Sequence, residues 1–106
     1  MPVQELTTAE FEERTSSGVT LIDFWAPWCG PCQMMTPVID ELDQEMGDKV
    51  SFAKVNIDDE PELAGKFQIR SIPAIFVVKD GEIAEQFIGV TSKEDLHAAL
   101  TKAVGT

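Results

Sequence analysis

Residues 19–32 read VTLIDFWAPWCGPC, and this stretch decides the fold. Its first part, residues 19–25, is rich in β-branched and aromatic side chains and almost continuously apolar, which is typical of a strand covered on both faces. Its last part places Cys29 and Cys32, the only two cysteines of the sequence, ahead of a long helical pattern. The stretch therefore predicts a central strand followed directly by a cysteine pair at the start of a helix.

The segment after the cysteines predicts a long amphipathic helix. Pro31 lies where the first turn of a helix tolerates proline, because that position needs no intrahelical N–H donor. The apolar stripe with helical spacing consists of Met35, Val38, Ile39, Leu42 and Met46. Pro37 falls inside this pattern, and since the stripe continues beyond it we expect a kink rather than an end of the helix. Met34 and Met35 are both expected to fill the core.

Two shorter helices are indicated by their starts. Thr7 and Glu10 form a capping-box pattern ahead of a helix that we expect to run through Arg14, before the Ser-Ser-Gly of residues 16–18 stops it. The acidic residues 58–60 suit the N-terminus of a helix, where the dipole favours negative charge. They predict a short helix directly after them.

The remaining strands follow from alternation and from one turn. Residues 50–57 alternate as a strand. Residues 74–78 and 83–88 flank Asp80 and Gly81, a dipeptide that strongly favours a tight hairpin. These two segments therefore predict an antiparallel pair.

A last helix and the absence of dividing segments complete the expected organisation. Ser92 and Asp95 form a second capping box, and apolar residues follow at helical spacing as far as Ala103. No repeat, low-complexity tract or linker divides the 106 residues. We expect a single domain over residues 1–106, of the α/β class, with helices covering a mixed sheet.

Composition and charge exclude several classes of function. The sequence has 8 Lys and Arg against 19 Asp and Glu, a net charge of −11, so nucleic acid and anionic membrane surfaces are not expected partners. No apolar run is long enough to span a membrane, and residues 1–5 (MPVQE) show no leader pattern. We expect a cytoplasmic protein that the charge keeps soluble and monomeric.

The cysteine pair has several possible structural roles and one chemical role. A stapling disulfide across so short a loop would constrain little of the unfolded chain. A zinc site needs four ligands, and besides Cys29 and Cys32 the chain offers one histidine, His97, on the last predicted helix. Unrelated buried thiols remain a third alternative. A redox-active dithiol is favoured, because CxxC at the start of a helix beside a strand–helix–strand pattern is typical of thiol–disulfide exchange.

Residues 25–32, WAPWCGPC, resemble the active-site signature of the thioredoxin family. The similarity extends over the whole chain, through Asp23, Lys54, the Ile-Pro-Ala of residues 72–74, and the two glycines at 81 and 89. It implies the thioredoxin fold, a central mixed five-stranded sheet flanked by four helices. It also implies a protein-disulfide oxidoreductase that needs no cofactor and no metal of its own.

The resemblance implies roles for four residues of the candidate centre. Cys29 would be the attacking thiolate, with its sulfur facing solvent at the helix start, and Cys32 the less exposed resolving thiol. Asp23 is the candidate base for the proton of Cys32, because burial in an apolar strand should raise its pKa, and Lys54 would moderate that shift. The alternative for Asp23 is a structural carboxylate that binds backbone.

The resemblance also implies residues that shape the site and hold the substrate. The shaping residues are Trp25, Trp28, Gly30, Pro31 and Pro73, the last expected as a cis-proline. The substrate-binding residues are Ile57, Ile72, Ala74, Ile88, Gly89 and Val90. The backbone at Ile72 would accept an extended substrate segment as an added strand. For Ile57 and Ile88 a place in the core is an alternative.

Three functions remain open from the sequence. The leading one is a protein-disulfide reductase that acts on disulfide-containing proteins and is itself recycled by a reductase, typically an NADPH-dependent flavoenzyme. An oxidant or isomerase is the second, although the Gly-Pro between the cysteines favours the reductase. A redox-independent binding subunit is the third. The chain departs from the family at Gln33, where Lys or Arg is usual, which weakens the electrostatic support for a thiolate.

Overall fold

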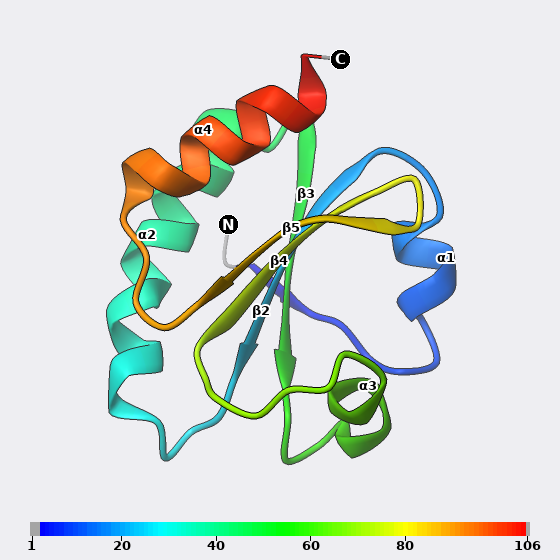
Figure 1. The fold of residues 1–106 in the computed structure, drawn as a ribbon, viewed down its shortest axis with the longest axis vertical. Coiled ribbons are helices and arrows are strands. Elements are labelled where there is room, and N and C mark those ends of the chain that lie inside the picture. The colour runs from blue at the N-terminus through cyan, green and yellow to red at the C-terminus, as the bar shows by residue number, and fades with distance from the viewer. Residues whose placement is uncertain (1–2, 106) are drawn as a thin grey trace.

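The computed structural model describes residues 3–105, in which a five-stranded sheet has helices on both faces (Figure 1). The strands are β1 (Gln4–Glu5), β2 (Val19–Trp25), β3 (Val50–Asn56), β4 (Ala74–Lys79) and β5 (Glu82–Ile88). The helices are α1 (Phe11–Thr15), α2 (Gly30–Met46), α3 (Pro61–Lys66) and α4 (Lys93–Val104). This confirms the expected fold class. Met1 and Pro2 of the opening segment, and Thr106, lie outside the described residues.

The sheet is mixed and has the order β1-β3-β2-β4-β5. Strand β2 is central, parallel to β3 on one side and antiparallel to β4 on the other. Six of its seven residues are buried, as the continuous apolar pattern predicts. Strand β1 is the element that the residue patterns missed, because a strand of two exposed residues has no period to read.

The two faces of the sheet are covered by different helices (Figure 1). On one face, apolar residues of α2 and α4 pack with alternate residues of the strands, among them Leu21 and Phe52. On the other face, Phe11 of α1 and Leu63 of α3 pack with Ile22 and the other intervening residues. Period-2 alternation along each strand therefore assigns every strand residue to one face.

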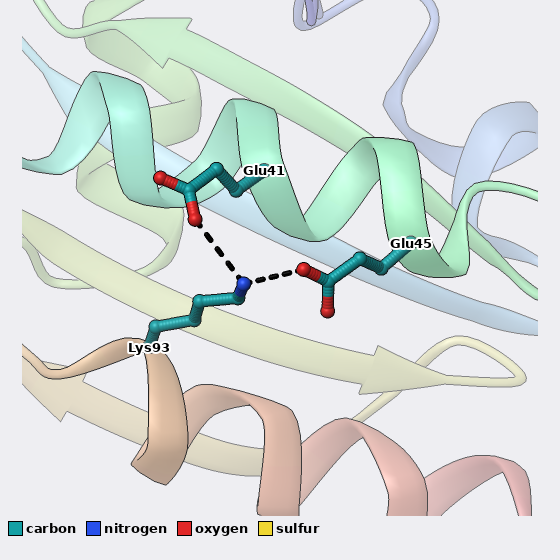
Figure 2. Close-up of polar contacts among 3 residues, drawn as sticks. All are labelled: Glu41, Glu45 and Lys93. Carbon is teal, nitrogen blue, oxygen red and sulfur yellow. Dashed lines mark hydrogen bonds and ion pairs between the residues drawn. The ribbon is translucent and has the colours of Figure 1, made fainter.

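Helix α2 carries the cysteines at its start and forms ion pairs with α4 nearer its end (Figure 2). Its predicted stripe is confirmed, since Met35, Ile39, Leu42 and Met46 are buried, and the helix continues through Pro37. At the start of α4, the Lys93 ammonium binds the carboxylates of Glu41, at 3.1 Å, and Glu45 of α2. This bridge holds the starting turn of α4 against the C-terminal half of α2.

One predicted helix start is wrong. The Thr7 hydroxyl accepts the Glu10 N–H at 3.3 Å, but the Glu10 carboxylate binds the same hydroxyl rather than the Thr7 backbone, so the box is not reciprocal. The bonds from Glu10 N–H to the Thr7 carbonyl and from Phe11 N–H to the Thr8 carbonyl span three residues, which is a tight turn. The α-helix therefore begins only at Phe11, after this turn, and ends at Thr15.

The other local predictions are confirmed. In the β4–β5 hairpin, Asp80 has φ +52° and Gly81 φ +86°, the left-handed pair that a tight hairpin turn requires. The Ser92 side chain accepts the Asp95 N–H at 3.1 Å and caps α4. Within residues 3–105, no helix has the length and apolar character needed to cross a membrane.

Candidate active site

The carboxyl end of β2 and the start of α2 place the two cysteines together. Cys29 is the N-cap of α2, with extended backbone, and its sulfur accepts the Cys32 N–H at 3.1 Å. The two residues form a disulfide, with their Cα atoms 5.3 Å apart. Because the free N–H groups of the first turn and the helix dipole favour negative charge here, this position stabilises a thiolate on Cys29 when the bond is reduced.

Both cysteines are more covered than the sequence suggests. Cys29 is 5% exposed and Cys32 is 2% exposed, and they form a small cluster with the buried Ala26. The expectation of a solvent-facing Cys29 sulfur is thereby corrected, because Trp25, Ile57 and Ile72 pack against the pair. The order of exposure is as expected, because Cys29 is slightly more exposed than Cys32.

The loop before β4 lies against the Cys29 sulfur. The Ile72 carbonyl oxygen is 3.8 Å from this sulfur, and the Ile72–Pro73 peptide bond is cis, as expected. The Pro73 carbonyl accepts the Gly89 N–H at 2.8 Å, which joins this loop to the end of β5. Gly89 has φ +89°, a conformation that favours glycine. Ala74 follows as the first, buried residue of β4.

Asp23 is a buried carboxyl on the same face of the sheet as α2. It is 5% exposed, and its Oδ1 atom has no hydrogen-bond partner. Desolvation raises the pKa of Asp23 from its ordinary 3.8 to about 7, the positive charge of Lys54 opposes this shift, and the negative charge of Glu5 adds to it. The direction and the cause of the shift agree with the sequence prediction.

Lys54 faces Asp23 in the sheet register but forms its ion pair elsewhere. Its Nζ atom is 3.7 Å from Glu5 Oε2 and lies 5.1 Å from the centre of the Trp25 ring. Among the described residues, its ion-pair partner is Glu5 and not Asp23. Glu5 was missed by the sequence reading, and only the pairing of β1 with β3 could have indicated it.

The residues expected to hold the substrate divide into exposed and half-buried groups. Ile88 is 54% exposed and Val90 is 53% exposed, so Ile88 does not belong to the core. Ile57 and Ile72 are half-buried and pack both on the cysteine cluster and on the core next to it. Gly30 and Pro31, in the first turn of α2, are exposed. Of the residues expected to hold the substrate, Ile57 and Ile72 therefore lie against the disulfide.

Trp28 and Met34 are two further exposed apolar residues. Trp28 is 67% exposed, and its indole N–H donates to Asp58 Oδ2 at 3.0 Å. The sequence reading used Asp58 only as a helix-start acid and missed this contact. Met34 is 62% exposed, so its expected place in the core is wrong. The reason is its position on α2, one residue before the buried Met35, which turns it toward solvent.

His97, the one histidine, lies on α4, where its Nδ1 atom is 3.4 Å from the Thr101 hydroxyl. Among residues 3–105, no three His, Cys, Asp or Glu side chains gather in an arrangement that could hold a metal ion. The arrangement offers the chemistry of a redox-active cysteine pair on the same face of the sheet as a buried carboxyl, Asp23, whose pKa is raised to about 7.

Comparison with known proteins agrees with this chemistry. The family model described as thioredoxin matches residues 2–102. The chain belongs to the thioredoxin family. It is 49% identical over 102 residues to the thioredoxin of Bacillus subtilis strain 168, an alignment covering 96% of this chain and 98% of that one. The thioredoxin of Listeria monocytogenes is 45% identical over 102 residues, with coverage of 96% and 99%.

Solved thioredoxin structures have the same fold. The crystal structure of Malassezia sympodialis thioredoxin (Mala s 13) superimposes with a TM-score of 0.88 at 36% identity, covering 98% of this chain and 95% of that one. Thioredoxins are protein-disulfide oxidoreductases, so the bonded Cys29–Cys32 pair is the redox-active centre of this chain. Membership in this family implies protein disulfides as substrates and a reductase as partner.

Proposed function

We propose that the protein is a cytosolic protein-disulfide reductase that supplies electrons to protein disulfides and is recycled by an NADPH-dependent flavoenzyme reductase. In this proposal residues 1–106 act as one domain and as a monomer. The observation that carries it is the Cys29–Cys32 disulfide at the start of α2, next to the Ile72 carbonyl and on the same face of the sheet as the buried Asp23. Its net charge of −11 supports a freely diffusing monomer.

The reaction begins with the reduced pair. The Cys29 thiolate attacks one sulfur of a substrate disulfide, forming a mixed disulfide and releasing the other substrate sulfur as a thiolate that takes a proton. Cys32 then attacks the Cys29 sulfur, which re-forms the intramolecular disulfide and releases the second substrate thiolate. Two electrons pass to the substrate, and the reductase returns two to the pair.

Asp23 is proposed to accept the proton that Cys32 loses in the second step. A carboxyl with a pKa of about 7 is partly ionised at neutral pH and can both take up and release a proton there. Lys54, which faces it in the register, keeps the ionised form accessible by lowering that pKa. Burial of Cys32 at 2% exposure supports this role, because bulk water has little access to its thiol.

The substrate is proposed to dock on the largely apolar and only partly exposed surface around Cys29. Its members are Trp28, Gly30, Pro31, Ile57, Ile72, Pro73, Ile88, Gly89 and Val90, with Ala74 beneath them at the start of β4. An extended substrate segment can bond the Ile72 backbone beside the sulfur, a recognition mode that reads main chain and so admits many sequences. Trp25 forms the wall of the site under Lys54.

The test is the reduction potential of the Cys29–Cys32 pair, measured by equilibration with defined ratios of reduced and oxidised glutathione. Thioredoxins themselves are the reference for a potential of about −270 mV, and oxidising or isomerising relatives lie near −180 to −120 mV. We expect a value near −270 mV despite Gln33. A value near −200 mV or above would assign the protein to oxidising or isomerising work instead.

A further inference from the structure

Three charged side chains lie in one row across the sheet near the redox centre. In the sheet register Glu5 of β1 is opposite Lys54 of β3, and Lys54 is opposite Asp23 of β2. Their strand neighbours two residues earlier, which point the same way, are all in the core under α2 and α4. The three side chains therefore share that face of the sheet.

Lys54, the middle residue of this row, forms its ion pair with Glu5 and not with Asp23. The Lys54 ammonium is 3.7 Å from Glu5 and stacks over Trp25, while Asp23 Oδ1 accepts no hydrogen bond. The Glu5 and Lys54 side chains are 49% and 33% exposed, so their ion pair contributes little to stability. Asp23 is deeply buried, where a nearby charge acts with little screening. Where Lys54 points therefore matters more to Asp23 than to the stability of the fold.

We propose that Glu5 is a positioning residue for Asp23: it holds the Lys54 ammonium at its own carboxylate, and so sets the pH at which the Asp23 carboxyl takes up its proton. The catalytic consequence rests on the proposed function, in which Asp23 accepts the proton of Cys32. Glu5 itself touches neither cysteine in the described structure and acts through Lys54.

The charges around Asp23 support this arrangement. Lys54 faces it from the neighbouring strand β3 and lowers its pKa, and Glu5, one strand further away on β1, raises its pKa. From β4 the registered residue is the apolar Ile75, and at the start of α2 the buried titratable groups are Cys29 and Cys32. Asp59 also raises the pKa of Glu5, whose shift is due mainly to desolvation. Among residues 3–105, Lys54 is thus the cation that affects Asp23.

The test is the variant Glu5→Gln, which keeps the shape of the side chain and removes its charge. The titration of the Asp23 carboxyl is followed by carbon NMR of chain labelled at aspartate, and the rate of the resolving step is followed against pH. With Lys54 released toward Asp23, the titration midpoint of Asp23 should fall by between about 0.5 and 1 pH unit, and the rate profile should move with it.

A matched control separates position from net charge. Asp48→Asn removes one exposed negative charge just before the start of β3, at the end of the strand opposite the redox centre. We expect an Asp23 midpoint within about 0.1 pH unit of the parent chain, because charges that far apart at the surface are screened. An equal fall in both variants would overturn the proposal. An unchanged or higher midpoint in Glu5→Gln would also overturn it.

The double variant tests whether the effect passes through Lys54. In a Lys54→Gln background, Glu5→Gln should move the midpoint by less than half as much as in the parent chain, since only the direct repulsion remains. An equal shift in both backgrounds would show that Glu5 acts on Asp23 directly and would overturn the positioning role. The NMR midpoint does not depend on turnover. If it moves while the rate profile does not, Glu5 positions Lys54 as proposed, and Asp23 fails as the base of the proposed function.

Discussion

The two faces of the sheet do different work. Under α1 and α3, the rings of Phe11, Phe24, Phe67 and Phe76 form one aromatic cluster, with centroids 4.9 to 5.6 Å apart and mostly edge to face. Under α2 and α4, the apolar core gives way near the carboxyl end of β2 to Asp23, Lys54 and the disulfide. The face under α1 and α3 packs mainly apolar side chains, whereas the face under α2 and α4 carries the reactive groups at the carboxyl end of β2.

The two faces also differ in whether they bury a side chain that can ionise. Among the described residues, the buried polar side chains are Thr15, Thr20 and Asp23, and only Asp23 can ionise. A neutral hydroxyl costs little when it is buried with a hydrogen-bond partner, as Thr15 illustrates by donating to the Phe11 carbonyl at 2.8 Å. A buried carboxyl is costly at neutral pH. It lies on the face that carries the disulfide.

The largest expected effect concerns the disulfide. Cys29→Ser should abolish disulfide reduction, because a serine hydroxyl is not ionised at neutral pH and cannot replace the thiolate. Cys32→Ser should instead accumulate the mixed disulfide with substrate, visible as an adduct by mass spectrometry. The opposite pattern, an adduct on Cys32 in Cys29→Ser and none in Cys32→Ser, would reverse the two roles.

On the other face, Phe24→Ala should act on stability alone. Phe24 is fully buried and contacts two other rings, so its truncation should lower the free energy of unfolding by about 3 to 5 kcal/mol, measured in denaturant. Met34→Ala, at an exposed apolar position, is the control and should change it by less than about 0.5 kcal/mol. The rate of attack by Cys29 in the folded Phe24→Ala chain should be unchanged. A large fall in that rate would mean that the faces are coupled.

Asp23→Asn should slow the reaction and stabilise the fold. In the folded chain the pKa of Asp23 is raised from 3.8 to about 7. Between these values the unfolded chain ionises first, so stability falls as pH rises, and above about pH 7 the full penalty is present. Asparagine removes the penalty, with a gain of as much as about 4 kcal/mol above pH 7 and little near pH 3.

The kinetic part of this prediction separates the two steps. Attack on a substrate disulfide by Cys29 should be nearly unchanged in Asp23→Asn, and release from the mixed disulfide should slow by about 10²-fold, as loss of a general base does. Stopped-flow measurement with a disulfide substrate resolves the steps. An unchanged release rate would make Asp23 a structural carboxyl. The difference in the free energy of unfolding between the variant and the parent chain should change with pH. A constant difference would contradict the raised pKa of Asp23.

The smallest effect is expected at the α2–α4 bridge. Lys93→Met removes the contacts with Glu41 and Glu45 and should lower the melting temperature by about 2 °C or less, a difference that disappears in high salt (Figure 2). The reduction potential should stay unchanged. A shifted reduction potential would show that the Lys93 bridge affects the cysteines at the start of α2.

Much of the fold could be predicted because its signals are local. The apolar run of residues 19–25, the stripe on α2, the Asp80-Gly81 turn and the Ser92 cap each depend on residues close in sequence, and each is confirmed. Strand β1 was missing from the pattern analysis because its two residues are ordered by pairing with β3 rather than by their own period.

The failures in the site have the same cause. The cover over Cys29 and the bond from Trp28 to Asp58 both depend on which segment packs beside which. No period along the chain contains that information. Met34 is different, because the helical period that buries Met35 turns the residue before it toward solvent. The exposure of Met34 could therefore have been predicted from the sequence.

The sequence by itself determined the order of the helices and of every strand except β1, the cysteine pair at a helix start and the one acid of the central strand, because propensity, capping and spacing act within a few residues. Only the tertiary structure decided that Glu5, Lys54 and Asp23 share one row, and that Lys54 pairs with Glu5. The reason is physical: register joins residues 49 positions apart or 31 apart, and the pKa of a buried carboxyl depends on the charges that such pairing brings near it.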